Sequence, residues 1–148
     1  MIEMKIIDPR LGSEFPLPEP ATTGSAGFDL RAMITEDYYL QPNETHMFPS
    51  GFAVHLDSSI CMLIMSRSGL GVKYGINVAQ KIGLLDQDYL GQLMIPLRNN
   101  SDKVFVIEPA MRVAQAVFVP YVIPEFKLVS EFSKQTERGE NGFGSSGL

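Results

Sequence analysis

Glycine and proline interrupt this chain at short intervals: 13 glycines and 10 prolines among 148 residues leave few windows long enough for a helix of several turns. Between them lie short segments in which apolar and polar residues alternate, or in which β-branched and aromatic residues follow one another. These segments are residues 28–32, 51–56, 89–97, 104–107 and 113–122. Many short strands separated by turn residues, such as residues 99–102 (NNSD), are typical of an all-β barrel or sandwich. The sequence therefore predicts an all-β fold with one short helix at residues 66–74, which begins at a serine and ends before a glycine.

Composition and length are those of one globular domain, with 45% hydrophobic and 20% charged residues and no linker or internal repeat. The formal net charge of −5 argues against a broad contact with nucleic acid, but it permits a small phosphorylated ligand held by a few arginines. No apolar run approaches the roughly 20 residues of a membrane span, and no secretory signal is visible. The single cysteine, Cys61, lies in an apolar run and is expected to be a buried thiol. We therefore expect a cytoplasmic protein that binds neither nucleic acid nor a membrane.

Three segments carry side chains that suit a phosphorylated ligand, and each also has an ordinary structural explanation. Residues 66–69 (SRSG) open the predicted helix, where a hydroxyl, a guanidinium and backbone N–H groups either bind an anion or only begin the helix. Residues 83–91 (GLLDQDYLG) contain an acidic turn, in which a carboxylate either activates a water molecule or only stabilises the turn. Residues 136–148 are polar and glycine-rich, which predicts a mobile arm. Composition alone favours a disordered tail there, but an arginine and a phenylalanine between glycines also suit closure over a nucleotide.

Other catalytic sites find no support in the sequence. The two histidines, His46 and His55, have no cysteine or acidic partner at metal-ligand spacing, which argues against a zinc site. No GxxxxGKS or GxxxxGKT loop is present, so the chain is not a P-loop enzyme. No Gly-x-Ser-x-Gly elbow indicates a hydrolase with a Ser-His-Asp triad. The three segments above remain the candidates.

Five segments form an ordered series along the chain. They are residues 26–32 (AGFDLRA), 67–76 (RSGLGVKYGI), 83–93 (GLLDQDYLGQL), 109–115 (PAMRVAQ) and 138–147 (RGENGFGSSG). In this order and spacing they resemble the five motifs of the trimeric, all-β dUTPase family, and five ordered motifs are far more specific than any one of them. The resemblance implies a single domain over residues 1–148 with the family's distorted jelly-roll or β-barrel fold. It also implies that residues 136–148 form a flexible arm that closes over the active site.

The resemblance implies hydrolysis of dUTP to dUMP and pyrophosphate with Mg²⁺ as cofactor, in a homotrimer whose subunits share each active site. Asp86 would activate the water that attacks the α-phosphorus, and Asp29 would hold Mg²⁺ through water molecules. Tyr89 would pack on the deoxyribose and leave no room for a 2′-hydroxyl. Contacts with the phosphates would come from Arg67, Ser68, Gly69, Gln115 and Arg138. Contacts with uracil would come from the hairpin at residues 80–86, with Gln80, Gly83, Leu84 and Leu85, from the backbone near Met94, and from Phe143, which is followed by Gly144 and Ser145.

Two departures from the usual family pattern involve three residues. Gln80 stands where related bacterial enzymes often carry a uracil-binding asparagine, and it offers the same amide on a side chain one methylene longer. Ala110 and Met111 stand where Gly-Asp or Gly-Glu is usual, so a turn glycine is lost, which suggests a local rearrangement.

Two other functions remain as alternatives. A dCTP deaminase shares the fold, but its reaction needs a glutamate shortly after the hairpin acid, and residues 93–97 (LMIPL) contain none. The other alternative is a catalytically silent, nucleotide-binding or regulatory relative. The presence of Asp29, Asp86, Tyr89 and the complete fifth motif argues against it.

Overall fold

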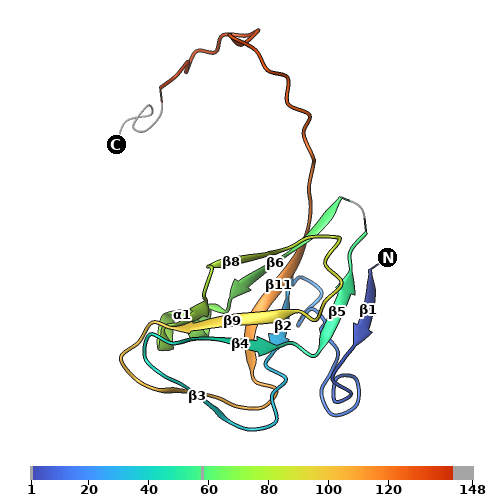
Figure 1. The fold of residues 1–148 in the computed structure, drawn as a ribbon, viewed down its shortest axis with the longest axis vertical. Coiled ribbons are helices and arrows are strands. Elements are labelled where there is room, and N and C mark those ends of the chain that lie inside the picture. Colours follow the sequence, from blue (N-terminus) through green and yellow to red (C-terminus); the bar gives the residue numbers. More distant parts are fainter. Residues whose placement is uncertain (1, 58, 142–148) are drawn as a thin grey trace.

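The computed structural model describes residues 2–57 and 59–141, and this part of the chain contains eleven strands and one helix (Figure 1). In chain order the elements are β1 (Glu3–Ile6), β2 (Phe28–Arg31), β3 (Tyr38–Leu40), β4 (Thr45–Pro49), β5 (Phe52–His55), β6 (Ile60–Ser66), α1 (Ser68–Tyr74), β7 (Ile76–Val78), β8 (Ile82–Leu85), β9 (Met94–Asn99), β10 (Phe105–Ile107) and β11 (Arg112–Pro120). The predicted all-β fold with one short helix is confirmed.

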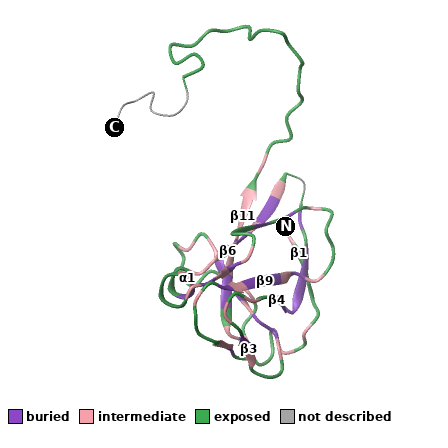
Figure 2. Cartoon of the chain, turned by 60° about the vertical axis from the view of Figure 1, so that its left-hand side comes forward, coloured by how far each residue is buried: buried purple, intermediate pink, exposed green. Residues whose placement is uncertain are grey.

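The strands pair only in the antiparallel sense within the described residues. One sheet has the order β2-β11-β6-β8 and a second has the order β4-β9-β7, while β1 pairs with β5 and β10 pairs with β3. Because successive strand residues point to opposite faces, each sheet turns one set of side chains inward. In β2, Phe28 and Leu30 are buried whereas Asp29 and Arg31 are only half-buried, as the alternation in the sequence predicts. The buried segments meet in the middle of the body (Figure 2).

The helix α1 is two residues shorter than predicted. It begins at Ser68, with Arg67 as its N-cap, and no side chain caps it. The hydroxyl of Ser66, expected to begin the helix, instead accepts a hydrogen bond from the backbone N–H of Val78 at 2.8 Å. Gly75 ends the helix in the left-handed conformation, at φ 70°, and its N–H bonds back to the last turn.

Three other expectations from the sequence need correction. The strand predicted at residues 89–97 begins only at Met94, because the chain first turns at Asp86, whose carbonyl accepts a hydrogen bond from Tyr89 N–H. The hairpin expected at residues 80–86 is a tight turn between strands with different partners: β7 pairs with β9, and β8 pairs with β6. The strand predicted at residues 113–122 spans Arg112–Pro120, and directly beyond it the Tyr121 N–H still donates a backbone hydrogen bond, to the carbonyl of Ser59 at 2.9 Å.

Residues 121–141 contain no helix or strand and leave the body as one extended segment (Figures 1 and 2). The segment without regular structure therefore begins well before residue 136. The free thiol of Cys61 is buried, as expected. Among residues 2–57 and 59–141, no helix has the length and apolar character needed to cross a membrane.

Candidate active site

The register of the four-stranded sheet places three of the sequence motifs in one row. Asp29 on β2 lies opposite Gln115 on β11, and Gln115 lies opposite Met65 on β6. Since Phe28 and Leu30 face the core, Asp29 lies on the outer face of this sheet. One residue beyond the end of β6 the chain reaches Arg67 and the start of α1. Pairing of distant strands therefore brings the first, second and fourth motifs together.

Two arginines share the Asp29 carboxylate. Arg67 Nε lies 2.8 Å from Asp29 Oδ1, and Arg112 Nη1 lies 3.4 Å from Asp29 Oδ2. Arg67 also donates a hydrogen bond to the carbonyl of Arg112, at 3.0 Å. Gln115 Nε2 donates to the carbonyl of Ser66, at 2.9 Å, and so ties β11 to the residue before Arg67. These contacts fix one carboxylate and one amide beside two guanidinium groups.

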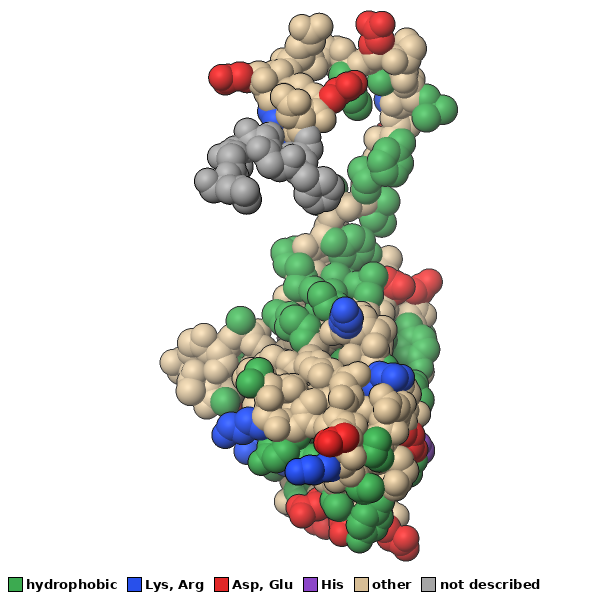
Figure 3. Space-filling model, turned by 90° about the vertical axis from the view of Figure 1, so that its left-hand side faces the viewer, with side chains coloured by type: hydrophobic (Ala, Val, Ile, Leu, Met, Phe, Trp, Pro, Cys, Tyr) green, Lys and Arg blue, Asp and Glu red, His purple; other side chains and the backbone are tan. Residues whose placement is uncertain are grey.

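The cluster opens into a depression of about 350 Å³. Its lining consists of Asp29, Arg67, Ser68, Gly69, Leu70, Lys73, Tyr74 and Gln115. The lining contains two cationic side chains, Arg67 and Lys73, and one carboxylate, Asp29. The depression is therefore cationic, although the chain as a whole has a net charge of −5. Gly69 has open space where a side chain would stand, so a ligand can approach the backbone there. The α1 end of the molecule faces the viewer in Figure 3, where Lys and Arg side chains are spread over a mostly uncharged surface. This arrangement suits a polyanion.

The expected catalytic carboxylate lies elsewhere in the same chain. Asp86 is exposed and directly follows Leu85, which pairs with Met62 on β6. Arg67 lies five positions beyond Met62, which corresponds to roughly 16 Å along an extended strand. Asp86 and Tyr89 accordingly do not line the depression that contains Asp29. Within one chain, the structure does not bring the third motif close to the first, second and fourth motifs.

The residues expected at uracil lie around the turn from β7 to β8. Gln80 is exposed, and Lys81 follows it in the left-handed conformation, at φ 68°. The Gln80 amide lies close over Gly83, because a Cβ there would be 3.0 Å from Nε2. Leu84 faces solvent, whereas Leu85 is buried. Met94, at the start of β9, is half-buried.

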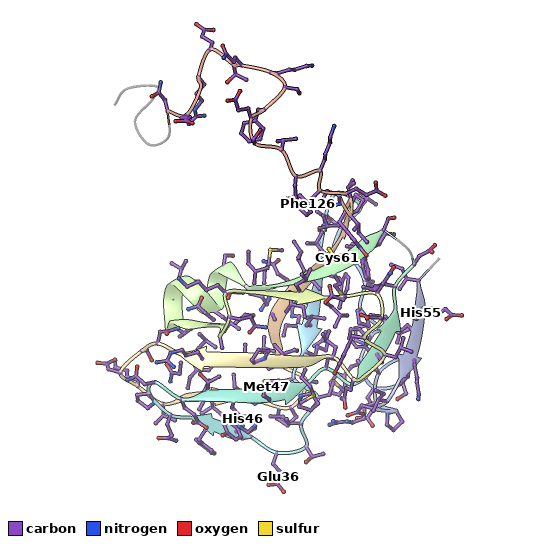
Figure 4. The ribbon with its side chains drawn as sticks, turned by 45° about the horizontal axis from the view of Figure 1, so that its top comes forward. Glu36, His46, Met47, His55, Cys61 and Phe126 are labelled. Atoms are coloured by element: carbon purple, nitrogen blue, oxygen red, sulfur yellow. The ribbon has the colours of Figure 1, made fainter. Side chains whose placement is uncertain are left out.

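The expected arm residues are only partly described. Arg138 lies in the exposed segment, where its Nε donates to the carbonyl of Asn141 at 2.9 Å. Phe143, Gly144 and Ser145 lie outside the described residues. The same segment exposes large apolar side chains, among them Phe126, which Figure 4 labels near the point where the segment leaves the body. The exposed apolar residues of this segment are Val122, Ile123, Phe126, Leu128, Val129 and Phe132.

Sequence reasoning did not assign a role to Arg112 or to the apolar part of the arm. Arg112 begins β11, and only the pairing of β11 with β2 brings it to Asp29. The sequence does contain a signal for the apolar part of the arm. Residues 122–132 are rich in aliphatic and aromatic residues, although no later segment of the sequence has the pattern of a strand that could pair with them.

Metal ligands do not cluster in the part of the chain that is described. No group of three or more His, Cys, Asp or Glu side chains lies close enough to hold an ion there. The two histidines, both labelled in Figure 4, have separate partners: His46 stacks on Tyr38, and His55 Nδ1 lies 3.1 Å from Glu3 Oε2. A metal at the depression would therefore have to share Asp29 with oxygen atoms of a ligand.

Comparison with known proteins gives the same assignment as the motifs. A sequence model of the dUTPase family matches residues 13–147. The deoxyuridine 5′-triphosphate nucleotidohydrolases of Actinobacillus succinogenes and Psychromonas ingrahamii are 51% and 52% identical to the chain over 147 residues, covering 99% of this chain and 97% of theirs. A mutant of the Staphylococcus bacteriophage 80alpha dUTPase with dUpNHpp matches the fold with a TM-score of 0.82 at 27% identity, over 100% of this chain and 99% of that one. Because the family model covers most of the sequence and the relatives are half identical over nearly their whole length, the chain belongs to the dUTPase family.

Proposed function

We propose that this chain hydrolyses dUTP to dUMP and pyrophosphate by attack of an Asp86-activated water molecule on the α-phosphorus. One observation carries the proposal: strand register gathers Asp29, Gln115 and Arg67 around a cationic depression that suits a chain of phosphates. The names of the relatives support dUTP as the substrate. In a cell, the reaction limits the incorporation of uracil into DNA and supplies dUMP for dTMP synthesis. The buried free thiol of Cys61 suits a reducing cytoplasm.

The phosphates would be held by Arg67, Ser68, Gly69 and Gln115. A guanidinium and an amide donate directional hydrogen bonds to phosphate oxygens, and charge-assisted bonds are about twice as strong as neutral ones. Lys73 adds positive charge at the same depression. Arg138 would reach the phosphates from the arm, which would close only when the nucleotide is bound.

Asp29 fits a water-mediated Mg²⁺ site. Mg²⁺ prefers oxygen ligands, keeps several of its waters, and is usually held by one or two carboxylates together with substrate phosphates. Asp29 supplies a carboxylate to the lining of the depression, and its side chain is 27% exposed, which leaves room for water. The ion, when bound, would neutralise phosphate charge. Asp29 meanwhile orients both Arg67 and Arg112.

The remaining roles follow from side-chain chemistry. The Asp86 carboxylate would accept a proton from the attacking water; a positioned base contributes about 10²–10⁴-fold to a rate. Tyr89 would pack on the deoxyribose, and Gln80 with the backbone of the following turn would bind the uracil edge. Phe143 would stack on the base.

We further propose that neighbouring copies of the chain build each site, in a homotrimer. Two observations support this. Leu85 lies opposite Met62, roughly 16 Å along β6 from Arg67, and Asp86 lies one residue further away, so Asp86 serves the depression of another copy. The apolar side chains of residues 122–132 are exposed in a single chain, and burying a large apolar side chain contributes about 1.5–3 kcal/mol. A neighbouring subunit provides the surface that covers them.

Pyrophosphate release from a panel of nucleotides, with and without Mg²⁺, tests the proposal. We expect rapid release from dUTP, and little from dCTP, dTTP or UTP. Deamination of dCTP would support the deaminase alternative, and tight dUTP binding without turnover would support the silent relative. Asp86→Asn is the control, since it preserves volume and binding but removes the base.

A further inference from the structure

Tyr89 and Gly91 touch closely in the turn between β8 and β9. The tyrosine side chain folds back over the glycine: a Cβ on Gly91 would lie 2.6 Å from the hydroxyl oxygen and 2.7 Å from Cζ. The hydroxyl also donates a hydrogen bond to the carbonyl of Gln92, at 3.1 Å. Two contacts therefore fix the tip of the ring, while the residue stays 45% exposed and can meet a ligand.

The glycine is needed here for space and not for backbone conformation. The glycines with positive φ are Gly12, Gly51, Gly75 and Gly139 among the described residues, and Gly91 is not one of them. An alanine can therefore adopt the backbone of Gly91, but its Cβ would occupy the place of the Tyr89 ring. Carbon atoms in contact normally lie about 3.5–4.0 Å apart, so the ring would have to move by roughly 1 Å.

We propose that Gly91 is a positioning residue that determines sugar specificity by holding the Tyr89 ring in place. The inference rests on the proposed function, in which Tyr89 closes the space beside C2′ of the nucleotide. A steric wall rejects an extra hydroxyl only while it cannot yield. With a Cβ beneath it, the ring loses its contact with Gly91 and its bond to the Gln92 carbonyl together, and it can swing into solvent. A 2′-hydroxyl is then tolerated, and the deoxyribose loses its packing surface.

The test compares kcat/KM for dUTP, UTP and dCTP in the wild-type chain and in Gly91→Ala. We expect the preference for dUTP over UTP to fall at least about tenfold, the low end for one lost steric contact in a pocket. The preference for dUTP over dCTP should stay within about twofold, because other residues bind the base. Tyr89→Ala removes the ring altogether, so it should give the largest fall in the preference for dUTP over UTP. Tyr89→Phe keeps the ring over Gly91 and removes only the hydroxyl, so it should give a smaller loss of the same preference.

Gly24→Ala is the matched control, because Gly24 has open space around it and no assigned role. It should keep both preferences, and both glycine variants should melt within about 2 °C of wild type. An unchanged preference for dUTP over UTP in Gly91→Ala would overturn the inference. So would an equal fall of both preferences with a lower Tm, since that indicates a general packing role. A wild-type chain that does not favour dUTP over UTP would overturn the proposed function itself, before any variant is compared.

Discussion

If neighbouring copies supply Asp86 and Arg67 to one site, two inactive variants should restore activity when they are mixed. Asp86→Asn removes the proposed base, which lowers kcat by about 10²-fold or more. Arg67→Ala removes a guanidinium that pairs with Asp29 and would hold phosphate, and a hydrogen bond to a charged group contributes about 1.5–3 kcal/mol. Each variant alone should therefore retain at most several per cent of wild-type kcat/KM.

The expected recovery follows from how the subunits combine. After equal amounts of the two variants are dissociated and reassembled at random, a site is intact when its Asp86 comes from an Arg67→Ala chain and its Arg67 comes from an Asp86→Asn chain. Each condition holds for half of the chains, so about one quarter of the sites are intact in a symmetric ring. If one chain supplied both residues, no site would be intact. The separation of Asp86 and Arg67 within a chain, which exceeds roughly 16 Å along β6, favours the first result.

The assay is steady-state pyrophosphate release from dUTP, with native mass spectrometry to show that mixed assemblies of three 16.4 kDa chains have formed. The matched control mixes Asp86→Asn with the double variant Asp86→Asn/Arg67→Ala, which can exchange subunits but contains no Asp86. That mixture should stay inactive. Mixed assemblies without recovery above the separate variants would refute the shared site.

Three further changes are expected to separate stability from function. Asp29→Asn weakens two partly exposed ion pairs of about 0.2–1 kcal/mol each, so differential scanning calorimetry should show a Tm lowered by at most about 8 °C, whereas the Mg²⁺ concentration needed for half-maximal activity should rise clearly. Hydrogen bonds from Arg10 lower the pKa of Asp8 below 3.8, so the ionised Asp8 stabilises the fold above that pH and the contribution is lost as pH falls through the lowered pKa. Urea titrations should therefore find Asp8→Asn less stable than wild type at pH 7 and equally stable well below pH 3.8. Deleting residues 137–148 should lower kcat/KM at least about tenfold with an intact trimer by light scattering, whereas deleting residues 122–148 should also disrupt the trimer.

Local patterns along the sequence predict the strands whose two faces differ. The alternation around Asp29 has a physical cause, since Phe28 and Leu30 fill the core on one side of β2 while Asp29 remains accessible on the other. Asn99 shows where such reasoning reaches its limit. It looks like a turn residue, yet its side chain is fully buried at the end of β9 and donates hydrogen bonds to the carbonyls of Leu40 and Lys103. A buried amide that joins two segments cannot be distinguished by residue type from one in a surface turn.

Long-range pairing was beyond the reach of the sequence. The short turn after β7 suggests that β8 folds back on it, but β8 pairs with β6, and this choice depends on which apolar faces can be buried together. It places Asp86 at the opposite end of β6 from Arg67. The five motifs lie in order along one chain, and that order does not indicate which of them meet in space.

The turn before β11 shows why a departure from the family pattern leaves the site intact. Ala110 stands where glycine is usual, and it adopts a left-handed backbone, at φ 58°, that glycine tolerates without strain. For a non-glycine residue this conformation costs about 1–2 kcal/mol. The buried Ala110 methyl contributes about 0.8 kcal/mol, and alanine loses about 0.4–1 kcal/mol less than glycine in unfolded-state entropy. The conformational cost at Ala110 and the combined gain from methyl burial and unfolded-state entropy nearly cancel. Hydrogen bonds from Ala110 N–H to the Ala32 carbonyl, and from Arg31 Nη1 to the Ala110 carbonyl at 2.9 Å, hold the turn, and Arg112 begins β11 where it can pair with Asp29.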